Sequence, residues 1–207
     1  RKMEEIEAFL QEKGRVVLKA PLSGSGKGIR FVAGELMETD RGGCRRTLES
    51  QGAVIVEERL DVVQEFAMLF EVGAGGIKFL GYSMFYASNG AYKGNMLASN
   101  GYIEEKLAKN VGKNILEGIR EKMAGFLQEK LGGRYTGFVG VDMFLYRGGD
   151  GRIMVNPAVE INLRMTMGLI ARNIFDHHRE ELQLGDGTNC FEPERGINSA
   201  ASPSDPN

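Results

Sequence analysis

The sequence predicts an α+β fold, in which strands and helices are mixed without regular βαβ alternation. Two strand-like segments, residues 66–72 and 77–86, follow one another directly and are joined by a glycine-rich turn at 73–76. A second pair, residues 138–146 and 152–155, has the same arrangement around its own glycine turn. Neighbouring antiparallel strands of this kind argue against a doubly wound parallel sheet, which needs a crossover connection between successive strands.

The N-terminal part of the chain predicts a small set of helices and strands. Met3, Ile6 and Leu10 recur at helical spacing, which predicts a helix over Met3–Lys13 that Gly14 is placed to end. The other elements predicted here are strands at residues 15–20, 28–32 and 54–57, and a partly helical polar segment at 41–52.

One long helical pattern lies in the second half of the chain. Apolar residues recur every fourth position from Ile103 onwards, which predicts one amphipathic helix, or two helices broken near Gly112. A strand at residues 159–163 and a helix at 167–175 follow. The hydrophobic content then falls, so that residues 179–207 are predicted to be a C-terminal tail.

Composition and charge exclude several classes of function. The chain has 207 residues, of which 42% are hydrophobic and 26% charged, as is usual for a globular protein with a core. Its formal net charge of -2 does not favour binding to nucleic acid or to acidic membranes. No apolar run reaches membrane-spanning length and no targeting signal is evident, so we expect a cytoplasmic location. Cys44 and Cys190 match no metal-binding spacing and are expected to be free thiols.

A loop rich in glycine and serine follows the strand predicted at residues 15–20. Glycine lets backbone N–H groups approach an anion closely and serine adds further donors, so the loop suits a phosphate group. On its own, a loop of this composition is equally compatible with an ordinary hairpin connection. The loop consists of Ser23, Gly24, Ser25, Gly26, Lys27 and Gly28.

Two familiar phosphate-binding templates fail at this loop. A P-loop needs glycine where Pro21 stands and serine or threonine where Gly28 stands. The dinucleotide fingerprint needs a further glycine at the position of Ile29. Lys19, on the preceding strand, can place a point charge on phosphates, although most such lysines extend along the surface towards water.

Polar residues within two apolar strands form a second constellation. Asp142 lies in the run FVGVDMFLY, where a carboxylate is costly to bury unless it is paired or bound to a metal. Downstream, Glu160, Asn162 and Arg164 alternate with apolar residues and so share one face of a strand. Glutamate and asparagine offer the hard oxygen ligands that suit Mg²⁺, and arginine can hold a carboxylate or phosphoryl group. The alternatives are an edge-strand aspartate and a solvated polar strand face.

Taken in order, these features resemble the ATP-grasp superfamily. The resemblance rests on Lys19 before the glycine loop, on the segments VIVEERL and QEF, on Asp142, and on the pattern V-E-I-N-L-R. The last pattern is similar to the one found in the branch that contains biotin carboxylase and carbamoyl phosphate synthetase. The resemblance covers residues 15–175 and implies a small lobe at 1–56 and a large lobe at 57–178, with ATP in the cleft between them.

The resemblance implies which residues contact ATP. The lysine and the glycine loop would hold the phosphates, and backbone groups after the segment VIVE would border the adenine. Glu65 would accept hydrogen bonds from the ribose, but residues 61–64 contain one residue more than many family members, so that Gln64 competes for this role. Glu58 is better explained as a surface charge. The implied nucleotide contacts are Lys19, Ser23, Gly24, Ser25, Gly26, Lys27, Gly28, Glu57, Glu58, Arg59, Leu60 and Glu65.

The resemblance also implies a metal site and two catalytic residues. Asp142, Glu160 and Asn162 would bind two Mg²⁺ ions, which Mn²⁺ could replace. Arg164 would stabilise an acylphosphate or orient the substrate carboxylate. Lys93, in the turn-rich segment GAYKGN, would reach the γ-phosphate or the substrate, although a solvated lysine is the commoner role for such a residue.

The reaction implied is that of an ADP-forming ligase, in which a carboxylate is activated as an acylphosphate and attacked by an amine or similar nucleophile. An ATP-grasp kinase or phosphotransferase and a non-catalytic ATP-binding module remain open. We expect small-molecule carboxylate and amine substrates, no nucleic acid or membrane partner, and a homo-oligomer formed through missing or exposed surfaces. ATP-grasp enzymes carry an upstream domain that helps to form the acceptor site. Because the sequence begins at Arg1, we expect this domain to be missing, which leaves turnover by the chain alone open.

Overall fold

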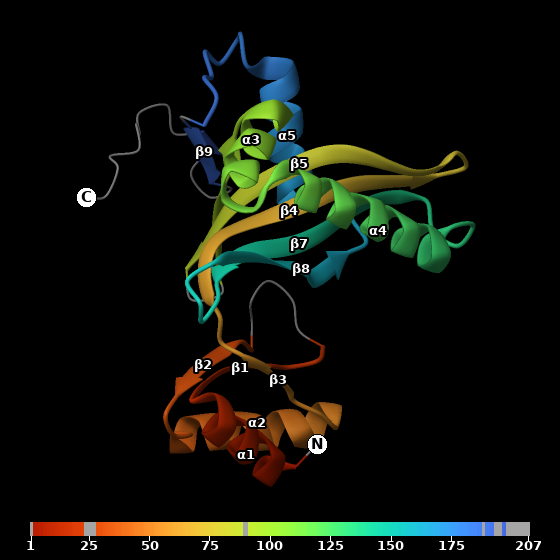
Figure 1. Cartoon of the computed structure of the whole chain (residues 1–207). Coiled ribbons are helices and arrows are strands. Elements are labelled where there is room, and N and C mark those ends of the chain that lie inside the picture. The colour runs from red at the N-terminus through yellow and green to blue at the C-terminus, as the bar shows by residue number, and fades with distance from the viewer. Residues whose placement is uncertain (1, 23–27, 89–90, 188, 193–195, 198–207) are drawn as a thin grey trace. The chain divides into compact units, whose positions relative to one another are not determined.

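Helices and strands are mixed along the whole chain, as the sequence predicts (Figure 1). The computed structural model describes residues 2–22, 28–88, 91–187, 189–192 and 196–197. The chain divides into a small unit and a large unit. The small unit comprises residues 1–60 with 87–92, and the large unit comprises residues 61–86 with 93–207.

The small unit contains a three-stranded antiparallel sheet in the described part of the chain. Its central strand β1 (Arg15–Lys19) lies between β2 (Arg30–Ala33) and β3 (Ile55–Glu58). Two helices, α1 (Met3–Lys13) and α2 (Glu38–Gln51), cover one face of this sheet (Figure 1). The helix predicted over the first segment is therefore confirmed.

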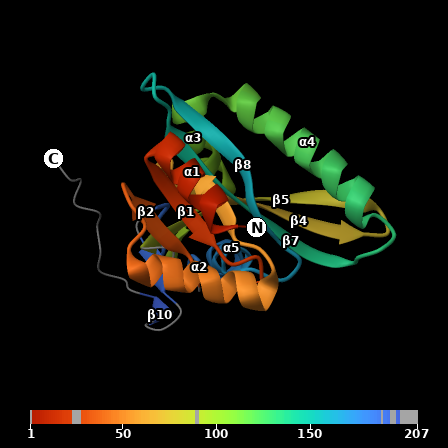
Figure 2. The same cartoon turned by 90° about the horizontal axis from the view of Figure 1, so that it is seen from below.

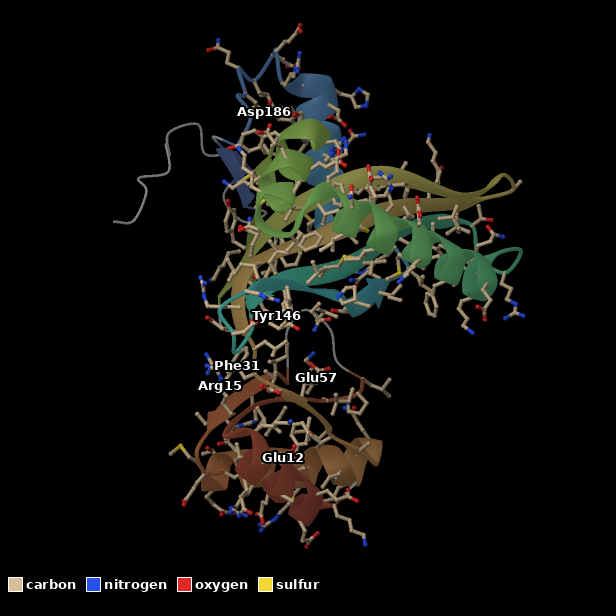
Figure 3. All side chains as sticks on the ribbon, viewed as in Figure 1. Glu12, Arg15, Phe31, Glu57, Tyr146 and Asp186 are labelled. Atoms are coloured by element: carbon tan, nitrogen blue, oxygen red, sulfur yellow. The ribbon has the colours of Figure 1, made fainter. Side chains whose placement is uncertain are left out.

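Alternation along β1 decides which side chains enter the core of the small unit. Val16 and Leu18 are buried against the helices. Phe31 and Glu57 both pair with Val17, so they lie on the opposite face, away from α1 and α2 (Figure 3). One face of the sheet thus packs on the helices, and the other presents polar and aromatic side chains.

The small unit extends further along the chain than the sequence predicts. Its first segment ends at Leu60, whereas the expected lobe boundary lies at residue 56. The difference arises because β3 continues to Glu58, which pairs with Val16 in the sheet. The division therefore follows the last strand that hydrogen-bonds to β1.

The large unit is built on one sheet, which in the described part of the chain has the strand order β10-β9-β6-β5-β4-β7-β8. The structure joins the segments predicted at residues 152–155 and 159–163 into one strand. It also adds β6, β9 and β10, which the sequence did not predict. The strands are β4 (Asp61–Gly73), β5 (Gly76–Ser88), β6 (Ala91–Leu97), β7 (Gly137–Arg147), β8 (Ile153–Asn162), β9 (Asn189–Glu192) and β10 (Gly196–Ile197).

Helices lie on both sides of this sheet. On one side are α3 (Asn100–Val111) and α4 (Lys113–Leu131), and on the other is α5 (Met167–His178) (Figure 1 and Figure 2). The predicted break near Gly112 is confirmed, because this residue ends α3 with a φ of 85°. Towards α3 and α4 the sheet buries the apolar core of the large unit, which includes Phe66, Met68, Phe70, Tyr82, Met84, Val139, Val141, Met143 and Leu145.

Two close contacts hold the first turn of α5 against the other side of the sheet. A Cβ atom at Gly168 would lie 2.4 Å from Oγ of Ser83 on β5. A Cβ atom at Gly140 on β7 would lie 2.6 Å from Cγ2 of Thr166, the residue that caps α5. Glycine at both places lets the start of α5 approach β5 and β7 more closely than any other residue would allow.

Part of the predicted C-terminal tail belongs to the large unit. β9 pairs with β6 through Asn95, Met96 and Leu97. Leu184 is buried against Leu97 and Phe175. The prediction of a tail is therefore wrong for these segments, and the last ten residues, 198–207, lie outside the described part of the chain.

No helix among the described residues is long and apolar enough to cross a membrane.

The contact between α5 and β5 leads to a stability prediction. We expect Gly168→Ala to lower the free energy of unfolding by about 1–3 kcal/mol, because the new Cβ would overlap Ser83 in buried surroundings. Gly118→Ala is the matched control in α4: nothing lies within 4 Å of its added Cβ, so we expect a gain of up to about 1 kcal/mol. Urea unfolding measures both. Equal shifts in the two variants would show that the close contact imposes no constraint.

Candidate functional site

A row of polar side chains crosses the α5 side of the large sheet. Asp142 pairs with Glu160 on β8 and with Ala67 on β4, and Ala67 pairs in turn with Ser83 on β5. Directly opposed residues on neighbouring strands share a face, so these side chains lie on one side of the sheet. Asn95 of β6 continues the row by donating Nδ2 to Oγ of Ser83 at 2.5 Å.

The pattern E-x-N-x-R meets Asp142 within this row. Nη2 of Arg164 donates to Oδ1 of Asn162 at 3.1 Å, and Nδ2 of Asn162 donates to Oδ2 of Asp142 at 3.0 Å. Asn162 is only 8% exposed, whereas Glu160 and Arg164 are exposed. The structure therefore brings these four residues together, in the alternation that the sequence predicts.

An irregularity in β8 explains why two predicted strands form one. The register with β7 shifts after the pair of Asp142 and Glu160, and the next pair is Phe144 with Asn156. Pro157 lies within the skipped stretch of β8 and has no N–H group for the ladder. The bulge accommodates Pro157 and its neighbours without ending the strand. β8 therefore continues to Glu160, which pairs with Asp142.

Burial and negative neighbours raise the pKa of Asp142 from 3.8 to about 6. The largest cause is the loss of water around the carboxyl group, and repulsion from Glu160 is the next. Glu65 adds a smaller repulsion, whereas the hydrogen bond from Asn162 and the charge of Arg164 act in the opposite direction. The arrangement thus favours either a proton or a cation at Asp142.

The donor atoms around Asp142 fit a hard divalent cation. Asp142 and Glu160 supply carboxylate oxygens, and Asn162 supplies an amide oxygen. Among the described residues, no three acidic, histidine or cysteine side chains gather at one point, so further ligands would have to come from a bound phosphate or from water. Asn162 now turns its nitrogen to Asp142 and its oxygen to Arg164, and binding a cation would require its amide to turn over.

Glu65 reaches the same face through an extra residue in β4. Between Val62 and Gln64 the register with β7 shifts and skips Val63, so β4 has one residue more here than the strand it pairs with. Gln64 donates Nε2 to the backbone oxygen of Glu65 at 2.8 Å. Glu65 pairs with Phe144, two positions from Asp142 on β7, and so faces the polar row. Of the two competing residues, only Glu65 lies on the side of Asp142.

In the small unit, Lys19 forms an ion pair that the sequence did not predict. Its Nζ lies 2.5 Å from Oε2 of Glu57, and the lysine side chain is only 21% exposed. Lys19 pairs with Ile55, so Glu57 is its diagonal neighbour on β3. The residue assigned to the phosphates therefore contacts one assigned to the adenine.

The other predicted nucleotide contacts of the small unit are spread over its surface. Gly28, the last residue of the loop, has a φ of 82°, which favours glycine. Glu58 lies 4.0 Å from Lys13, in agreement with its interpretation as a surface charge. Arg59 stacks its guanidinium 4.9 Å from the ring centre of Phe31, and Leu60 is half-buried. Ser23, Gly24, Ser25, Gly26 and Lys27 lie outside the described residues.

Lys93 lies on a strand and not in a loop. It belongs to β6, whose later residues pair with β9 far along the chain, so the local turn-like composition misled the prediction. Its side chain is exposed. Lys93 and Asn95 are two residues apart on the strand, so their side chains lie on the same face, which is that of the polar row.

Sequence reasoning missed Ser83, Asn95 and Gly168 as parts of this face. Ser83 and Asn95 are both buried, and Asn95 also donates to the backbone oxygen of Met84 at 3.1 Å. The available signal was the single serine in the apolar run GYSMFY, whose hydroxyl needs a partner when buried.

Solved structures of other proteins have a fold similar to that of this chain. No protein-family model and no curated protein matches the sequence. N5-carboxyaminoimidazole synthetase from Staphylococcus aureus, complexed with ADP, matches 87% of this chain and 41% of its own, with 16% identity and a TM-score of 0.53. D-alanyl-alanine synthetase A from Vibrio cholerae matches 84% of this chain and 51% of its own, with 16% identity and a TM-score of 0.56.

The chain spans about half or less of the length of these two proteins. At such low identity, the similarity establishes the fold. Both structural neighbours are ATP-grasp enzymes, and the predicted α+β class is confirmed. This chain therefore has the ATP-grasp fold.

Proposed function

We propose that the chain forms the ATP- and magnesium-binding part of an ADP-forming ligase. In this reaction the γ-phosphoryl group of ATP is transferred to a carboxylate, and an amine or similar nucleophile displaces phosphate from the acylphosphate. The observation that carries the proposal is the cluster of Asp142, Glu160, Asn162 and Arg164 on the large sheet. The solved structures support the general reaction, because both are synthetases and one contains ADP.

The large unit supplies the metal ligands in this proposal. Asp142 and Glu160 bind through their carboxylates, and Asn162 binds through its amide oxygen after turning away from Arg164. Bound Mg²⁺ or Mn²⁺ neutralises the negative charge of the phosphates. Arg164 is then free to hold the transferred phosphoryl group or the substrate carboxylate, and Lys93 is assigned to the same task.

The small unit supplies phosphate contacts in this proposal. Lys19 is held by Glu57 in the present structure, and we assign it to the phosphates once it leaves that carboxylate. The glycine loop that ends at Gly28 adds backbone donors. The remaining nucleotide contacts are assigned to the backbone of residues 57–60 for the adenine and to Glu65 for the ribose.

Glu160 provides the most direct test of the metal site. We expect Mg²⁺ to strengthen ATP binding by the wild-type chain, and Glu160→Gln to reduce that gain by about tenfold, since one charged ligand is lost. Isothermal titration with ATP, with and without Mg²⁺, measures the gain. Glu105→Gln, which removes an exposed glutamate on α3, is the matched control and should retain it.

Undiminished magnesium dependence in Glu160→Gln would contradict this metal assignment. The type of reaction is tested separately on the intact protein with a set of carboxylic acids and amines. ADP and phosphate released together with a condensed product support a ligase. A product that keeps the phosphoryl group identifies a phosphotransferase, and magnesium-dependent ATP binding without ADP release identifies a binding module.

The raised pKa of Asp142 leads to a prediction of how stabilisation by Mg²⁺ depends on pH. Without a cation, folding raises the pKa of Asp142 from 3.8 to about 6, so the folded state holds a proton that the unfolded chain releases. The free energy of unfolding should therefore fall by about 2 kcal/mol for this group as pH rises from about 4 to about 6. A cation bound by the carboxylate removes this loss, so stabilisation by Mg²⁺ should grow as pH rises through about 6.

Urea unfolding at pH 5 and pH 8, with and without Mg²⁺, measures this effect (both pH values bracket the pKa of about 6 given for Asp142). Asp142→Asn should lose both the dependence on pH and most of the stabilisation by Mg²⁺. Asp150→Asn, in the turn between β7 and β8, controls for loss of a carboxylate elsewhere. Equal stabilisation of the wild type at both pH values would contradict the assignment of Asp142.

A further inference from the structure

The small unit contains a pocket with two arginines that the proposed function does not use. It has a volume of about 210 Å³ and lies between the end of β1, the start of β2 and α2. Two of the residues that line it, Arg30 and Arg46, bring positive charges on the α2 side of the small sheet, and none of the described lining residues is acidic. Lys19 also borders the pocket, but its ammonium group is held by Glu57. All of the lining residues belong to the small unit.

Arg30 is held in the wall of this pocket by contacts with α2. Its Nη1 lies 3.3 Å from Oδ1 of Asp40, in the first turn of that helix. Its guanidinium lies so close to Gly43 that a Cβ there would be 2.7 Å from Nε. Glycine in a helix interior is unfavourable by about 1 kcal/mol relative to alanine, and here it makes room for the arginine.

Arg46 brings a positive charge that no carboxylate in the described part of the chain neutralises. Within the described residues it forms no ion pair, whereas its neighbour Arg45 lies 3.6 Å from Glu38. Its Nη1 would be 3.6 Å from a Cβ at Gly42, which places the guanidinium along the side of α2. An exposed arginine without an ion-pair partner among the described residues, in the same pocket as Arg30, attracts an anion.

The pocket also lies next to the residues that flank the glycine loop, here called its stem: residues 20–22 before the loop and Gly28 at its end. The backbone N–H of Leu22 donates to Oε1 of Gln51 at 2.8 Å, and Nε2 of Gln51 donates back to the oxygen of Leu22 at 3.3 Å. Gln51 is the last residue of α2, so the stem is tied to the helix that carries Arg46. Ala20 and Gly28, on either side of the loop, line the pocket.

We propose that this pocket binds a small tetrahedral oxyanion of the phosphate class, at a site separate from the nucleotide. One water molecule takes up about 30 Å³, so a cavity of about 210 Å³ has room for such an ion and several waters. Arginine matches the oxygens of phosphate with paired N–H groups. The ion would connect α2 with the stem of the glycine loop. The proposal goes beyond the ligase reaction and does not depend on it.

Inorganic phosphate is the probe, titrated into the full 207-residue chain at low salt and followed by calorimetry. We expect saturable binding by the wild type that Arg46→Gln weakens by about tenfold or more, as expected for loss of a charge-assisted contact. Arg45→Gln removes the adjacent, paired arginine and should leave the affinity unchanged. Absence of saturable binding by the wild type, or equal weakening by both substitutions, overturns the proposal.

A glycine pair in α2 tests the geometry of the pocket. Gly43→Ala should displace Arg30 and weaken phosphate binding, because the Cβ would overlap the guanidinium. Gly42→Ala should leave binding intact, because its Cβ would make only an ordinary contact of 3.6 Å. Urea unfolding confirms that both variants are folded. Identical phosphate affinities in the two variants contradict a role for Arg30.

Competition with ADP decides whether the pocket is separate from the nucleotide site. The proposal predicts that saturating ADP leaves phosphate affinity within about twofold, and that Arg46→Gln leaves ADP affinity unchanged. Displacement of phosphate by ADP, together with parallel losses of both affinities in Arg46→Gln, shows that the pocket holds a nucleotide phosphate and overturns the separate site. If the chain binds no nucleotide, phosphate binding still tests the pocket and only the ligase proposal fails.

Discussion

The pairing of β7 with β8 sets Asp142, whose carboxyl has lost much of its water, opposite the exposed Glu160. Asn162 and Arg164 offset this repulsion only in part, and the pKa of Asp142 rises to about 6. The rest of the large unit fixes this pair from both sides. The core below α3 and α4 holds β7, while close contacts at Gly140 and Gly168 set the start of α5 on the other side. A cation bound at this pair would offset both the repulsion between the two carboxylates and the loss of water around Asp142.

Much of the fold follows from local patterns in the sequence. Helical spacing from Met3 and the break at Gly112 are readable because each depends only on neighbouring residues. β6 is not readable in this way, because the turn-like segment around Lys93 becomes a strand only through partners on β9. The sequence does not reveal β8 as one strand for a related reason. Pro157 suggests a break, but the sheet accommodates it as a bulge. Long-range pairing overrides local composition at both places.

The candidate site shows the same division between local and distant information. Alternation along one strand is enough to place Glu160, Asn162 and Arg164 on a common face. The contact of Lys19 with Glu57, and the hydrogen bond between Ser83 and Asn95, depend on the register between strands and cannot be read from one segment. The resemblance to the ATP-grasp superfamily suggested that Asp142 and the E-x-N-x-R pattern belong to one site. In the structure, Asp142 on β7 pairs directly with Glu160 on β8.

The central claim is that the cluster around Asp142 binds the metal that accompanies ATP. The most direct measurement is a crystal structure of the chain with Mn²⁺ and a non-hydrolysable ATP analogue, in which anomalous scattering locates the metal. We expect Mn²⁺ in contact with oxygens of Asp142, Glu160 and Asn162 and with the phosphates, and an Asn162 amide turned away from Arg164. A bound nucleotide whose metal lies away from these three residues, with the present hydrogen bonds unchanged, would contradict it.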